Sequence, residues 1–568
     1  MADESMLTDE EILLLENLTY LTGPNGEKLV YAGYEDRTVG EFLNSIDTSE
    51  YIEDKDYGSY MTGEDWKDII QAVENNDTLM DMKIVATNVD NTNDGGGGQS
   101  VVFVSEDKGE AVVAFRGTSD DEWKDNFIGG GPTDATDGVS TAHQENALEW
   151  YQDVYKQCGL DDYTVTLTGH SKGGNKAKYI TLLDETVDRC VSFDGQGFSD
   201  EFMMVYADEI ADRQNLIENH NVDYDFVNLL LNDVGNTTYY EGYAIGAGGF
   251  AENHCPNTFF NFGDNGEFTM TLAENGQAEE MIILDDFLNS YLRSMSAQDK
   301  EQSLDLVGTI VDGLLSGENP EFIIDLMLDE DNRESAAHLL AYMIKYEQEN
   351  PEFADAVVSV LEEFDMADAA KIMDIVRSVM DWKYFDEVLS ALGVATNYIP
   401  DFIWDKLADY IKDKTGIELS ESELKELVSV LGMVSEDMEN IEIQDGEDIK
   451  IITTPNQIID NVINTIHSQM DFITGYFENF NIFSINLREI NSAGEMIDKC
   501  CDVLDKAIKS TEAVLNMGEM KSEVKNIILN LIEQMKTEKT ECKLLYDSLQ
   551  QFVNIYTNTE TSLVEMND

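Results

Sequence analysis

Three residues, Gly169, Ser171 and Gly173, form a G-x-S-x-G pattern that is typical of a serine nucleophile. A run of mainly β-branched residues over 164–168 precedes the pattern, and a helix is expected to follow it. Between a strand and a helix, such a serine lies on a sharp turn where side chains on the two glycines would clash. The turn would expose the serine hydroxyl to a base. It would also direct the backbone N–H of Lys172 toward a substrate carbonyl. The pattern therefore predicts a nucleophile elbow, and an inert tight turn is the alternative.

A serine nucleophile needs a base that takes its proton. The sequence contains six histidines, and two of them follow the serine in a plausible context, His220 and His254. His254 lies in an irregular stretch after the last expected strand, where a catalytic loop belongs. His220 precedes the strand that is expected to carry the acid. We therefore expect His254 to be the base, with a surface histidine near a proline turn as the alternative.

The base in turn needs an orienting acid, and in this type of sheet the chain order is Ser, Asp or Glu, then His. Asp233 follows an apolar run over 225–230, which predicts a strand with Asp233 at its carboxyl end. Asp194 is the rival, because it ends the expected strand over 190–193, but it could instead shape the floor of the pocket. Asp233 is the preferred prediction.

Acyl transfer also needs donors for the oxyanion that forms on the substrate. The elbow offers one donor, the Lys172 N–H. A second is expected from a loop that follows an earlier strand. The apolar run over 110–115 leads into Arg116, Gly117 and Thr118, where the glycine would let the chain turn beneath the serine. Thr118 could then present its N–H and its hydroxyl to the oxyanion.

Residues 115–118 together with 169–174 resemble the class 3 lipase group of α/β-hydrolases. The closest likeness is to a bacterial lipase-like branch of that group. In that branch the elbow is followed by a strand ending in Phe-x-Gly-x-Gly, here residues 193–197. A Leu-x-x-x-Glu helix is also expected near the N-terminus, here over 7–18. The resemblance extends over about residues 5–290 and implies an α/β-hydrolase fold.

This resemblance implies the roles of individual residues. Ser171 matches the nucleophile, Thr118 the oxyanion threonine, Asp233 the acid and His254 the base. The implied reaction is two-step hydrolysis of a lipid or other acyl ester by a serine hydrolase. It requires no cofactor and no metal. The complete Ser-Asp-His set argues against an inactive hydrolase fold that serves as a binding module.

The elements around these residues predict an α/β domain followed by helices. Strands alternate with helices in the first half of the chain, which indicates a parallel sheet. After about residue 285 the apolar residues recur at helical spacing. We expect an α/β-hydrolase domain over 1–290, a helical domain over 291–440 and a long-helix region over 441–568. The expected elements of the first domain are a helix over 7–20, strands over 83–87, 100–104, 110–115, 164–168, 190–193 and 225–230, and helices over 142–157 and 175–188.

The charge of the chain restricts its partners. There are 115 acidic and 35 basic residues, a net charge of −80, so nucleic acid and anionic membrane surfaces are repelled. No run approaches 18 apolar residues, and no secretory signal is visible at the N-terminus. The six cysteines form no metal or disulfide pattern, and the state of Cys255 is left open. The glycine-rich segments 128–132 and 242–249 are expected to be lid hinges or plain loops.

The last helices end in a Tyr-x-x-x-Glu pattern at Tyr556 and Glu560, which resembles the export signal of type VII secretion substrates. This resemblance implies a secreted antibacterial lipase. Small helical secretion partners would bind residues 455–568, and an immunity protein would neutralise the enzyme. The alternative is a cytoplasmic housekeeping esterase whose helical tail drives oligomerisation.

Overall fold

The computed structural model divides into two compact units, Met1–Lys450 and Ile451–Asp568. The expected long helices beyond residue 451 and their export signal lie outside the described residues, as do Thr118 and both glycine-rich segments apart from 242–243. The structure describes residues 6–29, 37–59, 61–89, 99–117, 139–243, 253–263, 267–295, 302–303, 306–310, 321–329, 331–363, 375, 379–380, 401–415, 418–444, 446, 448, 536 and 543.

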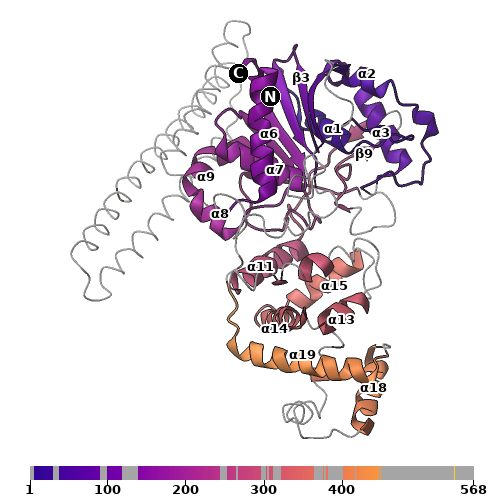
Figure 1. The fold of residues 1–568 in the computed structure, drawn as a ribbon, viewed down its shortest axis with the longest axis vertical. Helices are drawn as coiled ribbons and strands as arrows, with labels where there is room; N and C mark the ends of the chain where they lie inside the picture. Colours follow the sequence, from indigo (N-terminus) through magenta and orange to yellow (C-terminus); the bar gives the residue numbers. More distant parts are fainter. Residues whose placement is uncertain are drawn as a thin grey trace, which may run out of the picture. The chain divides into compact units, whose positions relative to one another are not determined.

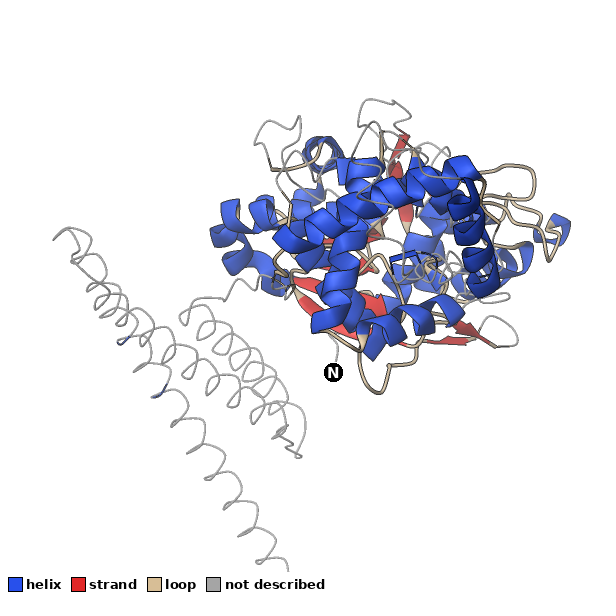
Figure 2. Cartoon of the chain, turned by 90° about the horizontal axis from the view of Figure 1, so that it is seen from below, coloured by secondary structure: helices blue, strands red, loops and turns tan. Residues whose placement is uncertain are grey.

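A mixed sheet of eight strands is the centre of the part described (Figures 1 and 2), and the predicted α/β architecture is confirmed. The strands follow one another in sequence order, with antiparallel pairing up to β4 and parallel pairing from β4 to β8. Parallel neighbours align their carboxyl ends, so the loops after β4, β5, β6 and β7 meet at one edge. The strands are β1 (Arg37–Thr38), β2 (Lys83–Val89), β3 (Gln99–Ser105), β4 (Glu110–Phe115), β5 (Thr164–His170), β6 (Arg189–Phe193), β7 (Ile217–Val222) and β8 (Asn236–Tyr240).

Helices cover both faces of this sheet (Figure 1). The expected first helix is confirmed as α1 (Asp9–Tyr20), where Thr8 and Glu11 form a capping box at its start. Its leucines pack on one face of the sheet, together with Val112 and Ala114 of β4. On the other face lie α6 (Ala142–Cys158) and α7 (Lys172–Leu183). The remaining helices of this region are α2 (Val39–Leu43), α3 (Gly63–Glu74), α4 (Asp77–Asp81), α8 (Asp200–Val205) and α9 (Ala207–Arg213).

The helical region that follows has its own apolar core, as the change of periodicity predicts. Its largest buried side chains include Tyr342, Tyr346 and Trp404. No described helix of the model is both long and apolar enough to cross a bilayer. The helices are α11 (Glu279–Arg293), α13 (Glu321–Leu328), α14 (Arg333–Glu349), α15 (Phe353–Glu363), α18 (Asp401–Thr415) and α19 (Glu421–Asn440).

One expected strand is wrong. Residues 225–230 form turns, and their apolar side chains are buried in a cluster with Met281 and Val360 rather than in the sheet. The strand lies earlier, at β7. There the polar residues Asn219 and His220 are buried because neighbouring strands and loops supply their hydrogen bonds. This shift moves the carboxyl end of the strand upstream of Asp225.

Glu110 links α1 to the sheet from a fully buried position. Its carboxylate accepts the Leu7 N–H at 2.7 Å and the Thr166 hydroxyl at 2.7 Å. We expect Glu110→Ala to lower the free energy of unfolding by about 2 kcal/mol, because both donors lose their acceptor in a dry site. The matched control is Glu106→Ala, which removes a surface ion pair with Lys83 and should cost less than about 1 kcal/mol. Equal shifts in the urea midpoints of the two variants would contradict this reading of Glu110.

Candidate active site

Ser171 lies at the junction of β5 and α7 in a conformation that L-residues rarely adopt. Its φ is +59°, and its N–H donates to the Phe193 carbonyl at 2.9 Å. Among non-glycine residues this region of φ is sparsely populated and is held in place by the surrounding chain. The strand, the sharp turn and the helix are those of the predicted nucleophile elbow. The side chain of Ser171 is buried.

Close backbone packing explains the glycines around this serine. A Cβ on Gly173 would lie 1.8 Å from the Phe115 carbonyl oxygen, so the start of α7 can approach β4 only if residue 173 is glycine. A Cβ on Gly117 would lie 3.0 Å from the Cβ of Ser171 and 2.8 Å from the His170 carbonyl. The chain leaving β4 therefore runs directly against the elbow. Thr118, the predicted oxyanion residue, comes next in the sequence.

The predicted base, His254, is paired with a carboxylate that the sequence analysis missed. Its Nδ1 lies 2.5 Å from Oδ2 of Asp225, which is completely buried. The other carboxylate oxygen of Asp225 accepts the N–H groups of Val227 and Asn228 at 2.8 and 3.0 Å. These donors satisfy the carboxylate and fix its orientation. With a proton on Nδ1 directed at Asp225, the Nε2 of His254 is left as the basic nitrogen.

The Nε2 atom of His254 is buried, and within the described residues it has no hydrogen-bond partner. The imidazole packs between Phe226, at 5.2 Å between ring centroids, and His170, at 4.6 Å. His170 directly precedes Ser171, so the base and the predicted nucleophile lie in one small region. Burial and the neighbouring His254 hold the pKa of His170 well below its usual value, so this second imidazole is neutral.

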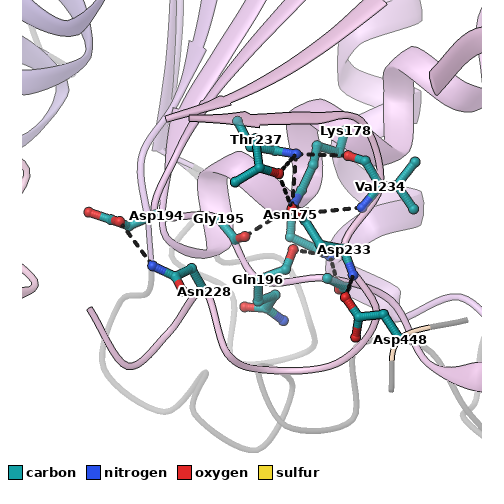
Figure 3. Close-up of polar contacts among 12 residues, drawn as sticks. Asn175, Lys178, Asp194, Gly195, Gln196, Asn228, Asp233, Val234, Thr237 and Asp448 are labelled. Atoms are coloured by element: carbon teal, nitrogen blue, oxygen red, sulfur yellow. Dashed lines mark hydrogen bonds and ion pairs between the residues drawn. The ribbon is translucent and has the colours of Figure 1, made fainter. Parts of the chain in front are cut away.

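Asp233, the predicted acid, is engaged elsewhere (Figure 3). Its carboxylate accepts from Lys178 at 2.9 Å, from Asn219 at 3.1 Å and from the Thr237 hydroxyl at 2.7 Å. Lys178 is a buried cation that needs this counter-charge. The structure therefore gives Asp233 a structural ion pair, and it places Asp225 where the sequence analysis expected Asp233. The expected order of the acid between the serine and the histidine still holds.

Asp194, the rival acid, also lies in the site but does not pair with His254. Its Oδ1 accepts the Val222 N–H at 2.7 Å and the Asn228 side chain at 3.4 Å, and Figure 3 shows the latter contact. Burial raises the pKa of Asp194 well above its usual value, and the charge of Asp225 raises it further. Its surroundings therefore favour the uncharged form of the carboxyl. Its φ of +45° adds a second strained residue beside the elbow.

The remaining predicted residues are placed as follows. Lys172 is the first residue of α7, so its N–H lies at the positive end of a helix dipole, next to Ser171. His220 lies inside β7, where Nδ1 contacts the Tyr240 hydroxyl at 3.0 Å, so it belongs to the interior of the sheet. Cys158, Cys190 and Cys255 are not in disulfides, and the Cys255 thiol contacts the Ser59 carbonyl at 3.2 Å.

Two groups of described side chains have the composition of a metal site, and ligand atoms within each group lie within 4.8 Å of one another. One group is Asp9, Glu218 and His220, and the other, His170, Asp194 and His254, lies in the candidate site. Because His254 is already oriented by Asp225, the arrangement as it stands suits proton transfer better than metal binding.

A signal for Asp225 was present in the sequence. The residue lies in a short polar stretch, 223–225, between an extended segment and a buried apolar run. The apolar run predicts a strand, and an acid at the carboxyl end of that strand would lie after the run rather than before it. With the strand placed at β7, the same rule, an acid just past the carboxyl end of a strand, selects this stretch.

Comparisons with known proteins add a family match over part of the chain. The Mbeg1-like family model matches residues 87–232, which include Ser171 and Asp225 but neither α1 nor His254. No curated protein matches the sequence. Among solved structures, a triacylglycerol lipase from Penicillium expansum matches with 18% sequence identity and a TM-score of 0.21. That match covers 34% of this chain and 83% of the lipase chain.

Proposed function

We propose that this protein is a serine ester hydrolase in which Ser171 is the nucleophile, His254 the base and Asp225 the orienting acid. The buried pair of His254 and Asp225 is the observation that carries the proposal. It leaves His254 with a basic nitrogen that has no partner among the described residues, and the same imidazole packs on His170, which directly precedes the strained Ser171. A histidine held in this way by a carboxylate is the arrangement that activates a serine hydroxyl.

In the first step, the Ser171 hydroxyl attacks the ester carbonyl while His254 Nε2 takes its proton. The imidazolium that forms is stabilised by Asp225, whose charge is fixed by two backbone N–H groups. The Lys172 N–H, at the start of α7, is oriented for the oxyanion, and Thr118 stays the predicted second donor. Collapse of the intermediate transfers the proton from His254 to the departing alcohol and leaves an acyl group on Ser171.

In the second step, His254 removes a proton from water, which attacks the acyl-enzyme carbonyl. Collapse of this intermediate breaks the bond to Ser171, releases the carboxylic acid and returns the proton from His254 to the serine oxygen. Asp194 lies beside the pair of His254 and Asp225 with a raised pKa. Because burial favours its uncharged form, it adds less negative charge beside Asp225 than an ordinary carboxylate would. The imidazolium charge can therefore form opposite a single carboxylate.

We propose an acyl ester of a lipid as the substrate. The likeness of residues 115–118 and 169–174 to class 3 lipases supports this substrate class, and the low exposure of Ser171 and His254 suits an apolar acyl chain. The acidic surface disfavours anionic lipid assemblies, so neutral acylglycerols are the preferred form of the substrate.

A fluorophosphonate probe tests the nucleophile directly, because it reacts with activated serines. Wild-type protein should be labelled at one site, and Ser171→Ala should abolish both labelling and hydrolysis of a short-chain ester. Ser45→Ala is the control, because this exposed serine bonds to a carbonyl three residues before it, that of Phe42, and lies far along the chain from the elbow. Labelling that survives Ser171→Ala would show that the nucleophile is elsewhere, and an unlabelled wild type would favour a binding module.

The two aspartates can be separated by the same substitution. Asp225→Asn should lower kcat by about 10³-fold or more, because an amide cannot stabilise the imidazolium and favours the wrong tautomer of His254. Asp233→Asn should keep kcat within about threefold, since an amide oxygen can still accept from Lys178, but it should lower the urea midpoint because the buried cation loses its counter-charge. Steady-state hydrolysis with circular dichroism as a folding check measures both. The reverse order of effects would restore Asp233 as the acid.

We further propose that residues 455–568 direct the enzyme out of a bacterial cell through helical partners, with an immunity protein protecting the producer. The Tyr-x-x-x-Glu pattern at Tyr556 and Glu560 supports this proposal. Full-length protein should accumulate in culture medium, and Tyr556→Ala should retain it in the cells while leaving ester hydrolysis unchanged. Tyr546→Ala, upstream in the same region, is the matched control. Equal export of the two variants would instead favour a cytoplasmic esterase.

A further inference from the structure

Helix α1 carries an unusual set of buried polar side chains. Glu16, Asn17, Thr19 and Tyr20 are all at most 7% exposed, although they belong to a helix that covers a sheet with leucines. Buried polar groups are costly unless they find hydrogen-bond partners, so their contacts should show what they are for. Glu16 remains largely protonated, since burial raises its pKa to about 8.

Thr19 bonds within the helix, to Glu16, whereas the other three side chains reach the chain segments that form the candidate site. Oε1 of Glu16 accepts the His170 N–H at 3.2 Å, at the residue before Ser171. The amide of Asn17 donates to the Pro256 carbonyl at 3.0 Å, two residues after His254. The third connection is made by Tyr20, which reaches the elbow and the end of β4 together.

The Tyr20 hydroxyl connects a backbone N–H with an imidazole ring. It accepts the Gly117 N–H at 2.8 Å and lies 2.9 Å from Nδ1 of His170. Because its oxygen accepts from Gly117, the phenol can direct its own hydrogen at His170, whose neutral imidazole accepts it. The Arg116 guanidinium lies over the Tyr20 ring, with its Cζ atom 4.9 Å from the ring centroid. One side chain therefore connects the residue before Thr118 with the residue before Ser171.

We propose that Tyr20 is a positioning residue for ester hydrolysis, which sets the spacing between the elbow and the segment that supplies the second oxyanion donor. The proposal rests on the proposed function of Ser171. The donors of an oxyanion site must be held in place before the reaction, and a displacement of about 1 Å can lower the rate about 10²-fold. Gly117 and His170 are each one residue from a predicted catalytic group, so a loose Tyr20 contact would shift both.

This assignment brings α1 into the candidate active site. The Mbeg1-like match begins at residue 87, whereas Tyr20 lies in α1. The elbow strand, the β4 exit and the loop with His254 would then be held in register by a helix more than 90 residues upstream of the nearest of them.

Tyr20→Phe tests the proposal because it keeps the ring and removes the hydroxyl. We expect kcat and the fluorophosphonate labelling rate to fall about 10-fold or more, with KM within about threefold of wild type. Tyr151→Phe is the matched control. Its ring is also fully buried, and its hydroxyl contacts Thr186 at 2.8 Å on the α6 side of the domain. Tyr151→Phe should change the urea midpoint of unfolding about as much as Tyr20→Phe does, but it should leave kcat unchanged.

Hydrogen exchange provides a readout that does not depend on activity. In Tyr20→Phe, exchange should rise in peptides containing residue 117 and residue 170, whereas Tyr151→Phe should leave both unchanged. A wild-type protein that the probe does not label would overturn the proposed function. The exchange result would still show whether the Tyr20 hydroxyl holds residues 117 and 170 in place. Labelling of Tyr20→Phe at the wild-type rate, equal exchange in the two variants, or a Tyr20→Phe chain that does not fold would overturn the role of Tyr20.

Discussion

The left-handed backbone of Ser171 is the constraint to which the surrounding chain is fitted. A non-glycine residue at this φ costs on the order of 1–3 kcal/mol, so the packing around it must outweigh that strain. The N–H of Ser171 is held by Phe193, Gly173 lies against the Phe115 carbonyl, and Gly117 lies against the Cβ of the serine. Three neighbouring strands therefore contribute to one turn. Their parallel alignment makes this possible, because it brings the end of each strand to the same edge.

A dry site limits how many charges it can hold, and the three buried acids near the elbow show different solutions. Asp225 has two backbone donors and the imidazole of His254. Asp194 accepts one backbone N–H and one side-chain amide, and Glu16 accepts the His170 N–H, but burial outweighs these bonds and raises the pKa of both groups. Neighbours whose uncharged form is favoured add less negative charge around the pair of Asp225 and His254. The excess of acids in this chain makes their neutralisation at the site more important than in a balanced protein.

Local patterns in the sequence predict the elbow, whereas the position of Asp225, the proposed acid, depends on tertiary packing. Ser171 could be found because the glycines and the flanking strand lie within ten residues of it. The sequence does not single out Asp225, because the apolar residues after it resemble a buried strand. In the structure they are instead covered by α11 and α15. The true strand was hidden by Asn219 and His220, whose polarity is compensated by partners far along the chain. The ion pair of Asp233 with Lys178 is likewise visible only once α7 and β8 are in contact with it.

The long-range hydrogen bonds of α1 also affect when the chain can complete its fold during synthesis. Asn17 contacts a carbonyl 239 residues further along, and Tyr20 contacts a ring 150 residues further along. During synthesis, α1 leaves the ribosome long before these partners exist, with an apolar face of leucines and an unpaired amide exposed to water. Contacts of such long range are slow to form, and waiting apolar segments are prone to aggregate. The proposed hydrolase activity would therefore arise late, after residue 256 has emerged. Nascent fragments that end earlier would contain Ser171 but would not be active.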